Sequence, residues 1–159
     1  MFRLEGPGNV RNFMFAATAA QGASLGARGE TPKPVILIVS DQKSISDILV
    51  LLLSAGQYEV ISVLEQDNPE EALNKAFGVL DVRKVSLIFS NIGVKSGMEF
   101  AGRRDPKIPF IFITSKIEQV KAASNEKNLN VTWYIPKAPN TDFTVVMDLA
   151  NDLLNSSES

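Results

Sequence analysis

Short apolar runs and amphipathic segments alternate along most of the chain, and this pattern predicts its secondary structure. Runs rich in β-branched and aromatic residues predict strands at 35–39, 58–64, 85–90, 108–114 and 131–135. Segments with apolar residues at helical spacing follow these runs and predict helices near 44–54, 69–80, 98–103, 116–128 and 142–155. Strands and helices that alternate in this way are typical of a parallel sheet covered by helices on both faces.

Local signals predict where some of these elements begin and end. Asn68 before Pro69 predicts a capped helix start, because asparagine accepts a free backbone N–H and proline fits the first turn. Ser44 or Ser46 is predicted to cap the start of the helix near 44–54. We expect Trp133, a large apolar residue in the last strand, to pack beneath a helix.

The predicted fold class is α/β, a doubly wound five-stranded parallel sheet with strand order 2-1-3-4-5 and right-handed crossovers. Residues 34–155 form the predicted domain, and 156–159 form a tail. Residues 1–33 are glycine-rich and carry four basic side chains against two acidic ones. They are interpreted as a flexible arm and linker, with a targeting peptide or a docking helix as alternatives.

Composition excludes several classes of chemistry. The chain has no cysteine and no histidine, which excludes disulfides, thiolate chemistry and any triad that needs an imidazole. The net charge of -2 argues against nucleic-acid binding through bulk electrostatics. No apolar run is long enough to span a membrane, and a cytoplasmic location is expected.

Polar residues gather where the predicted strands end. In an open parallel sheet these ends border one crevice, at the point where the first and third strands diverge. The residues expected there are Ser40 and Asp41 after the first strand, Asn91 after the third, Thr114 after the fourth and Lys137 after the fifth.

Four segments in this order resemble the receiver domain of two-component response regulators, which has a flavodoxin-like fold. They are 36–42, 87–91, 109–115 and 133–137. The family carries paired acids after the first strand, a phospho-accepting aspartate after the third, a hydroxyl residue after the fourth and a lysine after the fifth. Here Ser40 replaces the first acid and Asn91 stands at the acceptor position. The proline that usually follows the lysine is displaced to Pro139, and the loop after Asn91 is short.

These departures predict a pseudo-receiver that lacks phosphotransfer chemistry. An amide offers no anionic oxygen for attack on phosphorus, and Mg²⁺ prefers sites with carboxylates, of which only Asp41 remains. We therefore expect no enzymatic activity and no cofactor beyond weak Mg²⁺ binding. Asp41 is predicted to pair with Lys137 in place of a phosphate. Alternatively, Asp41 only caps the helix after it, and Thr114 and Tyr134 are ordinary sheet-end residues.

Two functions remain open at this point. The resemblance implies a protein-interaction module that uses the fourth helix, fifth strand and fifth helix, with residues Lys116, Gln119, Lys121, Tyr134, Pro136 and Pro139. Its partner would be a kinase, a downstream effector or a second copy of the chain. Alternatively, a flavodoxin-like domain binds a small ligand or nucleotide in the crevice, although no glycine-rich phosphate loop follows the first strand. The chain is expected to be a single-domain regulator or part of a longer protein.

Overall fold

The computed structural model describes residues 32–138 and 141–155, which form one parallel sheet of five strands in the order β2-β1-β3-β4-β5. The predicted fold class and strand order are confirmed. The elements in chain order are β1 (Val35–Ser40), α2 (Lys43–Ser54), β2 (Glu59–Leu64), α3 (Pro69–Val82), β3 (Val85–Asn91), α4 (Val94–Arg103), β4 (Phe110–Thr114), α5 (Ile117–Lys127), β5 (Trp133–Pro136) and α6 (Val145–Asn155).

The chain divides into two units, Met1–Lys33 and Pro34–Ser159, and the sheet belongs to the second. The predictions for residues 1–31, Pro139 and 156–159 lie outside the described residues. Among the helices that the structure describes, none combines the length and apolar character that a membrane span requires.

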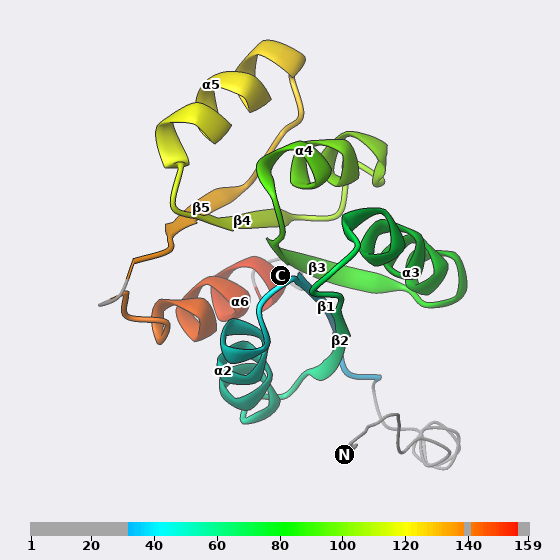
Figure 1. The fold of residues 1–159 in the computed structure, drawn as a ribbon. Coiled ribbons are helices and arrows are strands. Elements are labelled where there is room, and N and C mark those ends of the chain that lie inside the picture. The colour runs from blue at the N-terminus through cyan, green and yellow to red at the C-terminus, as the bar shows by residue number, and fades with distance from the viewer. Residues whose placement is uncertain (1–31, 139–140, 156–159) are drawn as a thin grey trace. The chain divides into compact units, whose positions relative to one another are not determined.

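The three central strands owe their position to their composition. Every residue of β1 and β4 is buried, and β3 is buried except for a half-buried Ser86. Such continuous apolar strands are stable only where helices cover both sheet faces. Figure 1 shows α3, α4 and α5 on one side of the sheet and α2 and α6 on the other. The parallel register places Ser40 beside Asn91, so the strand ends that carry the site are level.

Each face of the sheet has its own apolar core. Beneath α3, α4 and α5 a row of aromatic rings runs from Phe77 through Phe100 and Phe110 to Phe112, with centroid separations of 5.2, 5.4 and 5.3 Å. On the other face the core is mainly aliphatic and is built from β-strand isoleucines, Leu49 and Leu53 of α2, and Val146 of α6. The two cores hold the strand ends at fixed positions on a close-packed base.

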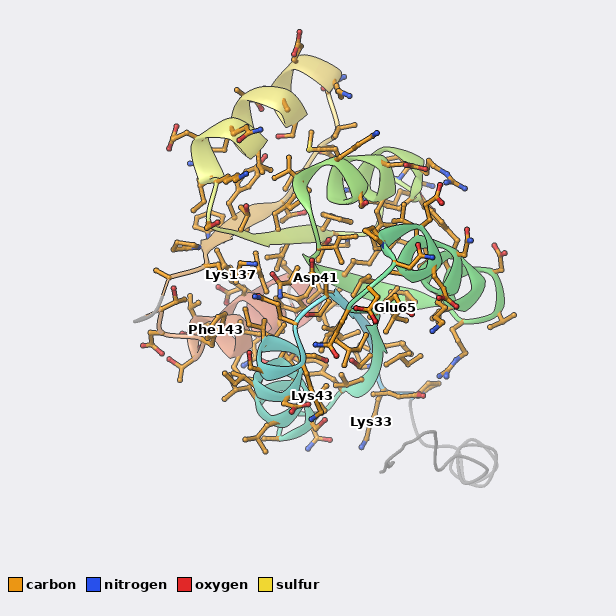
Figure 2. The ribbon with its side chains drawn as sticks, in the orientation of Figure 1. Lys33, Asp41, Lys43, Glu65, Lys137 and Phe143 are labelled. Atoms are coloured by element: carbon orange, nitrogen blue, oxygen red, sulfur yellow. The ribbon has the colours of Figure 1, made fainter. Side chains whose placement is uncertain are left out.

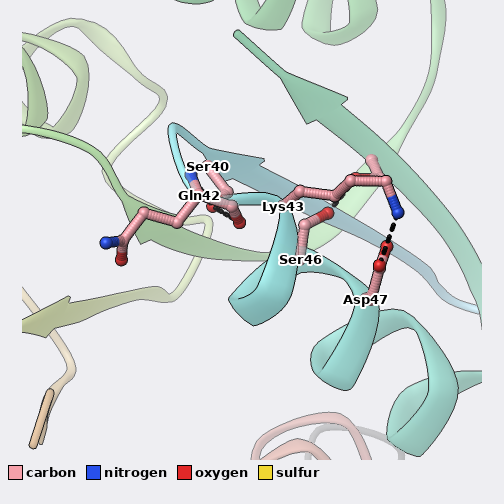
Figure 3. A network of polar contacts seen from close by, with 6 residues as sticks. Ser40, Gln42, Lys43, Ser46 and Asp47 are labelled. Atoms are coloured by element: carbon pink, nitrogen blue, oxygen red, sulfur yellow. Dashed lines mark hydrogen bonds and ion pairs between the residues drawn. The ribbon is translucent and has the colours of Figure 1, made fainter. Parts of the chain in front are cut away.

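The start of α2 differs from the prediction. The helix begins at Lys43 after Gln42, with no side-chain cap, so a cap by Ser44 or Ser46 is wrong. Ser46 is instead buried, and its hydroxyl group lies 2.7 Å from the Ser62 hydroxyl group of β2. Figure 3 shows Lys43 paired with Asp47 across one turn, at 2.7 Å. The predicted cap of α3 is confirmed, because the Asn68 side chain accepts the backbone N–H of Glu71 at 3.2 Å.

The expected burial of Trp133 is also wrong, since its side chain is 54% exposed. Trp133 begins β5, which is an edge strand. Its neighbour on the same face, Ile135, is buried in the core formed with α2 and α6. Helix α6 begins only at Val145 and packs against α2 and β3, which leaves the start of β5 uncovered.

A buried cation joins the segments that lead into β4 and β5. Arg104 is 4% exposed, and its guanidinium group donates to the carbonyl oxygens of Ala101, Ile108, Leu129 and Asn130 at 2.8–3.2 Å. Burial lowers the pKa of this guanidinium, while neighbouring Asp105 acts in the opposite direction. Arg104 thus joins the carboxyl end of α4 to the chain that leads into β5.

Close packing of α4 on β4 gives a stability prediction. A Cβ atom on Gly97 would lie 2.5 Å from a ring carbon of Phe112, which is 1% exposed and has no room to move. Gly97→Ala should therefore lower the free energy of unfolding by about 1–3 kcal/mol through overpacking. Gly78→Ala is the matched control, because nothing lies within 4 Å of its added Cβ, and this variant should gain about 0.5–1 kcal/mol. Chemical denaturation measures both, and an unchanged or higher stability of Gly97→Ala would contradict the prediction.

Candidate functional site

The strand ends bring the predicted site residues to one edge of the sheet. Helix α2 leaves β1 toward one face and α4 leaves β3 toward the other, which opens a crevice between these strands. Asp41 and Lys137 line a hollow of about 140 Å³ at this edge, together with Thr114. The structure therefore brings these three residues together at one edge of the sheet.

Ser40 and Asn91 form the buried floor of the site. They are 0% and 1% exposed, and the Asn91 amide nitrogen donates to the Ser40 hydroxyl oxygen at 3.1 Å. The same hydroxyl oxygen accepts the backbone N–H of Gln42 at 3.0 Å and donates its hydrogen to the Gln42 carbonyl at 2.9 Å. In this arrangement the Ser40 hydrogen is given to a carbonyl, so Ser40 presents a lone pair that the Asn91 N–H complements.

Lys137 completes the arrangement from the other side. Its ammonium group donates to the Asn91 amide oxygen at 3.0 Å and to the Gln42 side-chain oxygen at 3.1 Å. The Asn91 amide nitrogen also lies 3.5 Å from that Gln42 oxygen. The two ends of the Asn91 amide therefore serve different partners, with the oxygen bound to a cation and the nitrogen bound to neutral acceptors. We refer to Ser40, Gln42, Asn91 and Lys137 as the amide network.

Gln42 is a site residue that the sequence reasoning missed. Figure 3 shows its side chain directed away from α2, and its oxygen lies 3.1 Å from the Lys137 ammonium nitrogen and 3.5 Å from the Asn91 amide nitrogen. Its position was the available signal, since it follows Ser40 and Asp41 in the loop that enters the crevice. A side chain two residues beyond a strand end reaches the neighbouring strand ends easily.

The predicted pair of Asp41 with Lys137 is not formed. Among the residues that the structure describes, no ion pair includes either of them. Asp41 lines the hollow, and its backbone N–H donates to the Asn91 carbonyl at 3.1 Å. It is not the cap of α2, because Gln42 holds that position. Lys137 satisfies its ammonium group with neutral amide oxygens instead.

Thr114 and Tyr134 are engaged with α5 and its start. The Thr114 hydroxyl oxygen accepts the backbone N–H of Lys116 at 3.0 Å. The Tyr134 hydroxyl is hydrogen-bonded to Ser124 of α5, and its ring stacks on Phe112 with centroids 6.3 Å apart. The contacts of Tyr134 are therefore with α5 and β4.

Part of the predicted interaction surface borders this site. Lys116, Pro136 and Lys137 line an outer groove of about 480 Å³ at the start of α5, next to the small hollow. The Lys121 ammonium group lies 5.6 Å from the centre of the Tyr134 ring. We name Lys116, Lys121, Tyr134 and Pro136 the output face.

The site does not suit the magnesium ion that the resemblance implies. The residues that the structure describes contain no group of three potential metal ligands among Asp, Glu, His and Cys. Asp41 is the single carboxylate lining the hollow, and the Lys137 ammonium group is bound to the Asn91 amide oxygen. Asp41 alone is the minimum that Mg²⁺ usually binds, and the positive charge of the nearby ammonium group disfavours a second cation.

The network predicts a stability cost for losing its cation. Lys137→Met leaves the amide oxygen of buried Asn91 without its donor, which should lower the free energy of unfolding by about 1–3 kcal/mol. Lys84→Met, at an exposed lysine before β3, is the control and should change stability by less than about 0.5 kcal/mol. Equal effects of the two substitutions in urea denaturation would contradict a structural role for Lys137.

Several solved structures have a fold similar to that of this chain. The signal receiver domain of an HD domain-containing protein from Pseudomonas fluorescens Pf-5 has a TM-score of 0.60 at 22% identity, over 81% of this chain and 92% of that one. A two-component response regulator from Clostridium difficile has a TM-score of 0.59 at 20% identity, over 80% and 100% of the two chains. The chemotaxis response regulator CheY4 of Vibrio cholerae has a TM-score of 0.55 at 24% identity, over 75% and 98%.

Sequence comparison adds nothing to this structural likeness. No family model matches the chain, and no curated protein matches it. At these levels of identity the solved structures establish the fold and leave the chemistry to the residues of the site. Residues 34–155 therefore have the fold of response-regulator receiver domains.

Proposed function

We propose that this domain is a non-phosphorylatable, receiver-like signalling module that acts through protein–protein contact and has no enzymatic activity. The observation that carries the proposal is the Lys137 ammonium group held 3.0 Å from the amide oxygen of Asn91, at the position of the family's acceptor aspartate. The receiver fold of its structural neighbours supports a signalling role. The site chemistry supports the absence of phosphotransfer.

Two requirements of acyl-phosphate formation are missing. The reaction needs a carboxylate nucleophile, and Asn91 has a neutral amide. It also needs Mg²⁺ to offset the charge of the transferring phosphoryl group, and Asp41 is the single acid beside the hollow. We propose that the domain uses no cofactor and binds Mg²⁺ weakly at most.

The amide network opposes a simple return to phosphotransfer. A carboxylate at position 91 would turn one oxygen toward the lone pair of Ser40, whose hydrogen is given to the Gln42 carbonyl. It would also face the Gln42 side-chain oxygen, which now accepts from Lys137. Restoring the nucleophile alone therefore requires Ser40 to turn its hydrogen away from the Gln42 carbonyl, and the metal ligand at position 40 remains absent.

Phosphoryl labelling tests the proposal. With acetyl phosphate or phosphoramidate and Mg²⁺, the natural chain should incorporate no acyl phosphate, detected by intact mass before and after hydroxylamine. Asn91→Asp alone should remain poorly labelled, whereas Ser40→Asp combined with Asn91→Asp should label, since it supplies both nucleophile and metal ligand. Stoichiometric, hydroxylamine-labile incorporation into the natural chain would overturn the proposal.

The output face is the proposed contact surface, on the side of α5, β5 and α6. Lys116, Lys121 and Pro136 are exposed there, while Tyr134 is half-buried. The proposed partner is a kinase or a downstream effector, with a second copy of the chain as an alternative and no role for nucleic acid. We place this interaction in the cytoplasm on the same resemblance to signalling receivers.

Charge reversal on the output face tests this surface. Lys121→Glu should reduce partner retention in a quantitative pull-down from native extract at least tenfold, because it reverses an exposed charge on the face. Lys84→Glu carries the same charge change on an exposed lysine before β3 and should retain the partner. Proteins retained equally by both variants, or lost equally from both, would count against the output face.

A small-anion site is the second candidate function, favoured by one observation. Helices α4 and α5 both begin beside the hollow without a side-chain cap, and Lys116 and Lys137 line it. Thermal unfolding with phosphate, nucleotides or FMN separates the two functions. A saturable rise in Tm with one of these compounds favours the ligand-binding function, and no shift favours the interaction module.

A further inference from the structure

Helix α5 is held to the sheet by unusually little apolar contact. Its buried residues are Val120 and Ser124, one of them polar. Helix α4 buries Gly97, Met98, Phe100 and Ala101, and α2 buries three large aliphatic side chains and Ser46. Local opening free energy follows buried apolar contact, so α5 has the weakest hold among the helices compared.

The ends of α5 are closed mainly within the helix itself, and Glu118 in the first turn and Lys127 in the last turn complement the helix dipole. The helix begins after Lys116, which provides no side-chain cap and places a cation at the positive end of the helix dipole. It ends at Asn128 in the left-handed conformation, with φ of 56°. The Leu129 N–H closes that end by donating to the Ser124 carbonyl at 3.0 Å.

A polar contact therefore carries much of the attachment. The Ser124 hydroxyl donates to the Lys121 carbonyl at 3.1 Å, so the Tyr134 hydroxyl is the donor in the bond between Tyr134 and Ser124. Ser124 is 3% exposed, and the Tyr134 ring is fixed from below by Phe112. Lys121 adds a cation over the same ring.

We propose that α5 opens locally as a unit and that the bond between Tyr134 and Ser124 is the latch that sets how often it opens. Opening would uncover the Tyr134 ring on β5 without breaking the sheet or the amide network. The latch lies on β5 and α5, and none of its atoms belongs to Ser40, Gln42, Asn91 or Lys137. The inference therefore stands or falls independently of the proposed function.

Native-state hydrogen exchange of the full chain tests the latch. In the natural chain, amides of α5 should exchange at least tenfold faster than those of α4 and β3, through an opening that is insensitive to denaturant. Tyr134→Phe keeps the ring and removes the hydroxyl, and Ser124→Ala removes the acceptor. Each should speed α5 exchange about fivefold, the effect of one lost hydrogen bond, while α4 and β3 amides stay unchanged.

A matched control separates the latch from the general loss of a buried serine. Ser46→Ala removes a serine that is also 3% exposed and also bonded to a hydroxyl, on α2, and it should leave α5 exchange unchanged. The double variant of Tyr134 and Ser124 should match the single variants, because both remove one bond. Exchange of α5 only through global unfolding, or equal acceleration of every element, would overturn the proposal. If Ser124→Ala does not fold, Tyr134→Phe gives the same test.

Discussion

The bond between the Lys137 ammonium group and the Asn91 amide oxygen organises the site. An amide has one acceptor end and one donor end, so fixing its oxygen on Lys137 directs its nitrogen toward Ser40 and Gln42. Each partner then matches what it faces. Ser40 presents a lone pair to a donor, and Gln42 presents its side-chain oxygen to a cation and to an N–H group. The residues at positions 40 and 91 are therefore chemically matched to each other.

The scaffold that provides this geometry is built from residues outside the site. The central strands are buried on both faces, and their apolar packing holds the strand ends in place. The level register of Ser40 and Asn91 follows from the parallel pairing of β1 and β3. The same strand ends can carry different side chains in different proteins, which is why fold alone does not establish function.

Much of the fold was predictable because buried parallel strands leave a strong sequence signal. The apolar runs located all five strands, and Asn68 with Pro69 located the start of α3. Burial on the edge strand β5 was not predictable from the strand pattern. Trp133 is exposed because α6 begins only at Val145 and covers other strands, and this depends on tertiary packing. The Ser46 hydroxyl group is hydrogen-bonded to Ser62 of β2, a contact that no local capping rule predicts.

The positions of the strand-end residues were predictable from the sequence, whereas their hydrogen-bond partners were not. Strand-end residues converge in any doubly wound sheet, so Ser40, Asp41, Asn91, Thr114 and Lys137 could be grouped in advance. The choice of partner by Lys137 depends on which oxygens lie within reach. The structure places neutral oxygens of Asn91 and Gln42 there, while Asp41 lines the hollow apart from any ion pair in the described part of the chain. Charge pairing alone would have favoured Asp41.

The measurement that tests this account most directly is thermal unfolding with Mg²⁺ and beryllofluoride, which together occupy the phosphoryl position of a competent receiver site. A bound ligand at a hundred times its Kd stabilises a protein by about 2.7 kcal/mol, which shifts Tm by several degrees. A site without phosphotransfer chemistry should give no shift in the natural chain and a saturable rise in the variant with Ser40→Asp and Asn91→Asp. A saturable rise of several degrees in the natural chain would contradict it.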